Sequence, residues 1–254
     1  MARHRFHVDE LSTDRVEITG EEADHARRVL RLAPGDAVEL LDGRGGVAAG
    51  EVVEVGRTFR IDIDDRRQAP RLKPLVDVAA AIPKGDRAAT LIEKASELSA
   101  DRVIPLITER SVVDPGKGKR KRFERIAAES AKQCGRAWTM AVDAPVALPE
   151  LLAQADHDVK LIADVPRAGE DMQQLQAEAA RSDSVSRPYD AQTETVLVLI
   201  GPEGGWTEAE RAQPREAGFA TWRLGPAVMR IETAALAALA ILRYPAQPMH
   251  MDKP

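Results

Sequence analysis

Cysteine is almost absent from this chain: Cys134 is the only one in 254 residues. An internal disulfide is therefore excluded, and a cysteine-based metal site is not expected. Aromatic residues make up only 4%, which argues against recognition of nucleic acid by extended base stacking. No apolar run approaches the roughly 20 residues that span a bilayer, and the first ten residues lack a signal-peptide core. These absences favour a cytoplasmic protein without a metal or a membrane partner.

Positive charge is also in deficit, because the formal net charge is −5. Non-specific coating of nucleic acid or of an anionic membrane is therefore not expected. Local basic patches remain: residues 117–125, KGKRKRFER, hold six basic side chains in nine positions. Two interpretations stay open for this segment, a solvated helix start and a contact with RNA.

The first 70 residues have the pattern of a small β-barrel, with short β-rich segments and few helical spacers. One helix is predicted among them at 21–32. The polar, proline-bearing segment 66–74 is interpreted as a domain boundary. The predicted strands cover residues 15–20, 36–43, 47–55 and 58–65.

After residue 74 apolar strands alternate with helices, which predicts a mostly parallel sheet covered on both faces. The polar segment 166–194 is interpreted as a loop insertion, with room for one exposed helix. Strands are predicted at 75–82, 102–108, 159–164, 194–200 and 220–224, and helices at 86–100, 121–135, 149–155, 207–218 and 232–244.

The stretch LVLIGPEGGWTEAE, residues 197–210, reads as strand, glycine loop and helix. It has no lysine for phosphates and no G-x-G-x-x-G spacing, so neither a Walker loop nor a dinucleotide fingerprint fits. Thr207 and Glu210 form a capping box that already specifies the helix start, so the glycines are not needed to end the strand. A carboxylate at Glu203 suits a ligand with hydroxyls, an amine or a positive centre. S-adenosylmethionine offers all three, although a plain strand-to-helix turn remains the alternative.

A second stretch, LGPAVMRIETAALAALAIL, covers residues 224–242. A tight turn precedes a helix whose alanines cover nearly all sides, which predicts close packing and burial, in part at a subunit interface. Arg230 and Glu232 lie where that helix begins. The alternative interpretation of these two residues is a surface ion pair.

Together these stretches resemble the RsmE family of the SPOUT superfamily, S-adenosylmethionine-dependent enzymes that methylate N3 of a uridine in 16S ribosomal RNA. Residues 25–36, 83–111 and 127–136 resemble further family blocks in the same order. The chain departs from the family pattern at Ser99, Lys132 and Ile231, and Ile231 lacks the hydroxyl that the family usually has at that position.

The resemblance implies a PUA-like, RNA-binding β-barrel over 1–70 and a SPOUT α/β domain over 74–248, with a deep trefoil knot and a mostly parallel sheet. It also implies a homodimer. The knot is expected to hold S-adenosylmethionine through Asp164, Ile200, Gly201, Pro202, Glu203, Gly204, Gly205, Leu224, Gly225, Met229 and Ile231.

The implied substrate is 16S ribosomal RNA. An acidic protein with local basic patches suits the assembled small subunit better than free RNA, although both stay open. Glu232 is the candidate for orienting or deprotonating the uracil, and Arg230 for stabilising its charge or holding a phosphate. A non-catalytic RNA-binding protein with this fold and a methyltransferase for another RNA remain alternatives. The predicted RNA contacts are Arg27, Arg28, Arg31, Lys84, Arg110 and Arg136.

Overall fold

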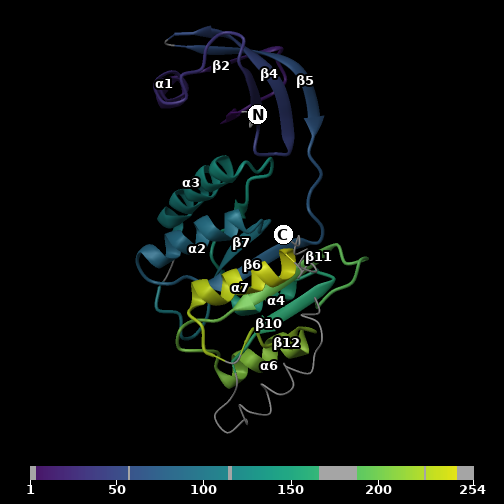
Figure 1. The fold of residues 1–254 in the computed structure, drawn as a ribbon. Helices are drawn as coiled ribbons and strands as arrows, with labels where there is room; N and C mark the ends of the chain where they lie inside the picture. The colour runs from purple at the N-terminus through teal and green to yellow at the C-terminus, as the bar shows by residue number, and fades with distance from the viewer. Residues whose placement is uncertain (1–3, 57, 114–115, 166–187, 226, 245–254) are drawn as a thin grey trace, which may run out of the picture. The chain divides into compact units, whose positions relative to one another are not determined.

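The computed structural model describes residues 4–56, 58–113, 116–165, 188–225 and 227–244 (Figure 1). The chain forms two compact units, Met1–Leu72 with Ala128–Thr139, and Lys73–Ala127 with Met140–Pro254. The helix that the sequence allows within 166–194 and the predicted domain end at 245–248 fall largely or wholly outside the described residues.

The first unit is built on a five-stranded sheet in the order β1-β3-β4-β5-β2. β1 pairs with β3 in parallel, and the other pairs are antiparallel. Alternate side chains of the strands, among them Phe6, Leu40 and Phe59, form a buried core. All four predicted strands are present, but β1 was missed because Phe6 is the only apolar residue in its sequence HRFH. The strands are β1 (His4–His7), β2 (Arg15–Ile18), β3 (Ala37–Leu41), β4 (Gly46–Val55) and β5 (Phe59–Gln68).

The helix of this unit, α1 (Gly20–Arg28), is shorter than the predicted 21–32. The chain turns at Arg31, whose φ is 54°, so that Leu32 is buried and donates its N–H to the Ala26 carbonyl at 3.1 Å. The prediction that Arg31 shares one helix with Arg27 and Arg28 is therefore wrong. Burying Leu32 outweighs the cost of a left-handed residue, which is of order 1 kcal/mol.

The segment Ala128–Thr139 belongs to the first unit, although the predicted domain limits place it in the second. Gly45 N–H donates to the Ala137 carbonyl at 2.8 Å, and Thr139 N–H donates to Gly43 at 2.9 Å. The Trp138 indole N–H donates to the Ala69 carbonyl at 3.0 Å. The sequence pattern does not show that the chain returns to the first unit at Ala128, because this residue lies inside the helix predicted at 121–135.

The second unit holds a sheet in the order β12-β10-β11-β6-β7-β8, with β9 also on β7. Every pairing within it is parallel, as predicted. β8 and β9 were not predicted, because two residues give no periodicity. The strands are β6 (Leu75–Ala81), β7 (Arg102–Ile107), β8 (Ala141–Val142), β9 (Val146–Ala147), β10 (Val159–Ala163), β11 (Thr195–Ile200) and β12 (Ala220–Trp222).

Helices cover both faces of this sheet, also as predicted. Along β11, Val196 and Val198 pack with α2 and α7 on one face, while Leu197 and Leu199 pack with α4 and the residues that flank α6 on the other. Figure 1 shows α7 beside β6. The helices of this unit are α2 (Asp86–Glu97), α4 (Leu148–Gln154), α6 (Glu208–Glu216) and α7 (Ile231–Arg243), and α3 (Gly116–Cys134) belongs to it up to Ala127. The chain path required for a knot stays a prediction.

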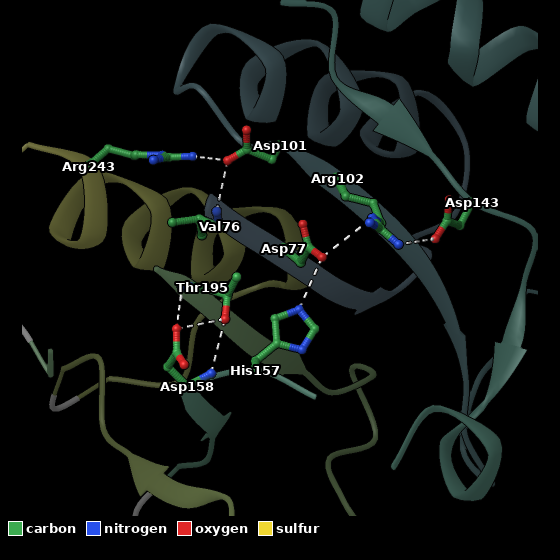
Figure 2. Close-up of polar contacts among 9 residues, drawn as sticks. All are labelled: Val76, Asp77, Asp101, Arg102, Asp143, His157, Asp158, Thr195 and Arg243. Atoms are coloured by element: carbon green, nitrogen blue, oxygen red, sulfur yellow. Dashed lines mark hydrogen bonds and ion pairs between the residues drawn. The ribbon is translucent and has the colours of Figure 1, made fainter. Parts of the chain in front are cut away.

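Polar side chains tie together the amino ends of the parallel strands (Figure 2). Asp77 of β6 contacts His157 at 3.2 Å and Arg102 at 3.4 Å. Asp158 accepts the N–H groups of Glu194 and Thr195, each at 2.9 Å, and these donors hold the pKa of its carboxyl below the usual value. Asp101 accepts the Val76 N–H at 2.8 Å and pairs with Arg243. This network fixes the edge of the sheet away from the cavity described below.

Candidate functional site

A cavity of about 290 Å³ lies where β10, β11 and β12 end. These strands are parallel neighbours, so their carboxyl ends meet at one edge of the sheet, the usual place for a ligand in such a fold. Three segments supply most of the lining, residues 163–165, 200–206 and the turn between Leu224 and Ile231. The cavity is thus built from the ends of three neighbouring strands.

All the residues predicted to hold the ligand line this cavity, from Asp164 through the 200–205 loop to Met229 and Ile231. They come from three separate stretches of the chain, and the sheet brings them together. Their role toward a ligand stays a prediction.

The glycine loop is held against the sheet by Trp206. Its indole N–H donates to the Ala163 carbonyl at 2.9 Å, and the side chain is almost fully buried. A Cβ added at Gly201 would lie 2.7 Å from the Trp206 ring, so only glycine fits there. Gly205 has a φ of 66°, a conformation that disfavours residues with a side chain. The loop backbone is therefore fixed before any ligand binds.

The predicted capping box is confirmed. Glu210 N–H donates to Thr207 Oγ1 at 3.2 Å, and Thr207 N–H donates to Glu210 Oε2 at 3.0 Å. The other oxygen of Glu210 accepts the Glu109 N–H at 2.7 Å. Glu210 thus fixes the start of α6 and joins it to the segment that follows β7.

Arg110, predicted to contact RNA, packs on the glycine loop. Its Nη1 donates to the Gly204 carbonyl at 2.8 Å, and a Cβ added at Gly204 would lie 3.1 Å from Arg110 Cβ. The side chain is exposed, so a further contact is sterically open. Within the second unit, its observed role is to support the loop.

Asp164 is held by Arg211, a lining residue that sequence reasoning missed. Arg211 Nε lies 2.9 Å from Asp164 Oδ2, and both side chains are largely buried. Asp164 Oδ1 accepts the Val165 N–H at 2.9 Å. The capping box could have indicated Arg211, because a residue four positions after Thr207 lies on the same face of α6.

Arg230 and Glu232 flank the start of α7, but in different environments. Arg230 is the exposed N-cap residue, whereas Glu232 is buried in the first turn, where the helix dipole favours a carboxylate. Neither lines the cavity, although Ile231 between them does. The ion-pair partner recorded for Glu232 is Arg87, at 3.8 Å, so the alternative of an Arg230–Glu232 surface pair is not observed.

The remaining predicted RNA-contact residues divide between the units. In the first unit, Arg27 Nη2 lies 2.6 Å and Arg28 Nε lies 3.9 Å from Asp24 Oδ1. Arg31 lies at the turn after α1, and Arg136 lies in the segment Ala128–Thr139. In the second, Lys84 is exposed between β6 and α2. Arg28 keeps 72% of its side chain exposed despite its contact.

Among the described residues, no group of three or more His, Cys, Asp or Glu side chains is arranged to hold a metal ion. Within the same residues, no helix has the length and apolar character of a membrane span.

Known proteins resemble this chain over nearly its whole length. The RNA methyltransferase domain family matches residues 71–243, and the RNA methyltransferase PUA domain matches 18–61. Ribosomal RNA small subunit methyltransferase E of Mycobacterium bovis is 33% identical over 92% of this chain and 88% of its own length. The Bacillus subtilis protein of that name is 32% identical over 93% and 92%.

A solved structure agrees with these sequence matches. Ribosomal RNA small subunit methyltransferase E from Neisseria gonorrhoeae, crystallised with S-adenosyl methionine, superposes with a TM-score of 0.76 and 26% identity, covering 94% of this chain and 96% of that one. The first unit is thus a PUA-like domain and the second an RNA methyltransferase domain. By family match and by fold, the chain belongs to the RsmE family of RNA methyltransferases.

Proposed function

We propose that this protein transfers a methyl group from S-adenosylmethionine to N3 of a uridine in 16S ribosomal RNA of the small subunit. The observation that carries the proposal is the chemistry of the cavity. Its charged lining side chains are two carboxylates, Asp164 and Glu203, and one guanidinium, Arg211, which already pairs with Asp164. A polyphosphate would meet no cation among the lining side chains except Arg211, which is already paired, whereas a sulfonium with ribose hydroxyls and an amine suits the two carboxylates, even though Glu203 also contacts Arg87 at 3.2 Å.

The fit extends to the backbone. The 200–205 loop is fixed by Trp206 and Arg110, so its peptide groups can bind a ligand with little loss of conformational freedom. When bound, S-adenosylmethionine supplies an electrophilic methyl group on a positively charged sulfur. The residues proposed to hold it are those of the three lining segments.

The protein's own task is then to prepare the uracil. N3 carries a proton and is a poor nucleophile until that proton is removed or the resulting anion is stabilised. Glu232, buried at the first turn of α7, accepts the proton or orients the base. Arg230, exposed at the N-cap, is placed to meet a uracil oxygen or a phosphate.

The RNA is proposed to contact exposed basic side chains of both units. Arg27, Arg28, Arg31 and Arg136 would act from the PUA-like unit, and Lys84 and Arg110 from the methyltransferase unit. An acidic protein with separate basic groups suits a folded ribosomal particle better than free RNA. A ribosomal substrate also places the protein in the cytoplasm.

The ligand preference is tested by calorimetry with S-adenosylmethionine, ATP and NAD. S-adenosylmethionine is expected to bind, while ATP and NAD are not. Gly205→Val should weaken S-adenosylmethionine binding at least tenfold, about 1.4 kcal/mol, because a β-branched residue is strained at a φ of 66° and the loop must move. Gly118→Val, at a glycine with open space and no positive φ, is the matched control. Tight ATP binding without S-adenosylmethionine binding contradicts the proposal.

A homodimer is proposed from the outer face of α7. Leu236, Ala237 and Ile241 are apolar yet only half-buried within the single chain. Ala237→Glu is expected to convert a dimer to a monomer in light scattering at micromolar concentration, because an unpaired charge would enter the interface. Ala238→Glu cannot report on assembly, since Ala238 is already fully buried inside its own chain. A monomeric wild-type protein would rule the dimer out.

The reaction itself is tested with small ribosomal subunits from cells that lack this gene. The protein and labelled S-adenosylmethionine are expected to give 3-methyluridine at one position of the 16S RNA, identified by nucleoside analysis. Free 16S RNA and large subunits serve as comparison substrates. A label that appears only in another RNA favours the alternative methyltransferase, and no label in any RNA favours a binding protein without chemistry.

A further inference from the structure

One arginine connects the glycine loop to the buried glutamate at the start of α7. Arg87 lies in the first turn of α2, directly after β6. Its Nη2 is 3.2 Å from Glu203 Oε1, and its Nη1 is 3.8 Å from Glu232 Oε2. Two nitrogens of one guanidinium therefore contact two carboxylates from different segments of the chain.

The contact with Glu232 is unusual because Oε2 is fully buried and accepts no hydrogen bond within the described structure. An ionised carboxylate oxygen in such a place is costly unless a cation compensates it. Among the described residues, Arg87 is the only recorded ion-pair partner of Glu232. With Oε2 enclosed, a target base can reach only the other oxygen, Oε1.

We infer that Arg87 is a positioning residue for the proposed methyl transfer: it holds the Glu232 carboxylate in place, with Oε1 as the oxygen available to the uracil N3–H. The inference rests on the proposed function. Arginine suits the task because its rigid fork can reach two carboxylates at once, whereas a lysine offers a single point charge. Glu203 fixes the other side of the guanidinium and itself lines the cavity, so Arg87 also couples the cavity to Glu232.

The test replaces Arg87 and measures methyl transfer to small subunits over a range of substrate concentrations. Arg87→Gln is expected to lower kcat at least tenfold while changing the Kd for S-adenosylmethionine less than threefold. Arg87→Lys should give an intermediate kcat, because a lysine keeps the positive charge but cannot reach both carboxylates with separate nitrogens. Arg215→Gln, on the exposed side of α6, removes the same charge as a control and should leave the rate unchanged.

A double-variant cycle tests whether the two residues act as a unit. At saturating S-adenosylmethionine, Arg87→Gln combined with Glu232→Gln should be no slower than Glu232→Gln alone, because the effect of Arg87 on the chemical step is exerted through that carboxylate. Multiplicative losses overturn the inference, as does an Arg87→Gln protein with the wild-type kcat. A wild-type protein that methylates no RNA refutes the proposed function itself, and the inference falls with it.

Discussion

Glu232→Gln is expected to reduce methyl transfer to small ribosomal subunits at least a hundredfold while leaving S-adenosylmethionine affinity within a few-fold. Glutamine keeps the size and can still orient a base, but it cannot accept the N3 proton. A loss of this size is typical when general base help is removed. Glu232 does not line the cavity, so its exchange should spare the ligand. The measurement is initial rate against substrate concentration, with calorimetry for the ligand.

The matched control is Glu150→Gln on α4, which removes an exposed carboxylate of the same unit and should leave the rate unchanged. Arg230→Ala gives a second comparison. Because Arg230 is exposed and Glu232 is buried, the two changes should differ: Arg230→Ala should raise KM for the RNA if it holds a phosphate, or lower kcat if it stabilises the uracil anion. Normal turnover in both variants would show that these residues are structural.

The candidate site was predictable where local pattern determines geometry. Gly-Pro-Glu-Gly-Gly between an apolar strand and a capping box specifies a tight loop at the end of a parallel strand, and the structure has the loop there. The Leu224-Gly225 sequence after β12 likewise specifies a tight turn before α7. Parallel neighbours then bring such loops to one edge of the sheet, so both patterns contribute to one cavity.

The residues that support the site were not predictable, because their partners lie far away in the sequence. Arg87 acts across more than a hundred positions on Glu203, and Arg211 reaches back to Asp164. Nothing in the sequence around an arginine indicates which distant carboxylate it meets. The predicted place of Arg31 in the helix was wrong for a different reason. The helical spacing of apolar residues continues past Arg28 in the sequence, but the chain turns at Arg31 so that Leu32 is buried.

The second large effect is expected at the other end of α7. Arg243 pairs with Asp101 and donates to the Pro74 carbonyl, with only 3% of its side chain exposed and 10% of that of Asp101 (Figure 2). Arg243→Met should lower the free energy of unfolding by about 3–5 kcal/mol, because it removes the guanidinium that pairs with the buried Asp101 carboxylate. Urea unfolding followed by circular dichroism measures the change.

Two variants separate this cause from a general loss of packing. Arg120→Met breaks an exposed pair with Glu124 and should cost about 0.5 kcal/mol or less. Adding Asp101→Asn to Arg243→Met should recover part of the stability, because the asparagine oxygen can still accept the Val76 N–H and no buried charge remains. A double variant that is no more stable than Arg243→Met would refute the charge argument.

Arg243 lies at the end of α7 opposite to Glu232, so its contacts should also affect the site. The first turn of α7 presents Glu232 near the cavity, and its last turn is fixed to the amino ends of β6 and β7 through Pro74 and Asp101. The helix is thus anchored at the edge of the sheet opposite the cavity. Loosening that anchor should let the first turn shift, so Arg243→Met should also lower kcat, at a temperature where the variant is still folded. A destabilised variant with full kcat would show that the start of α7 is held by its buried side chains alone.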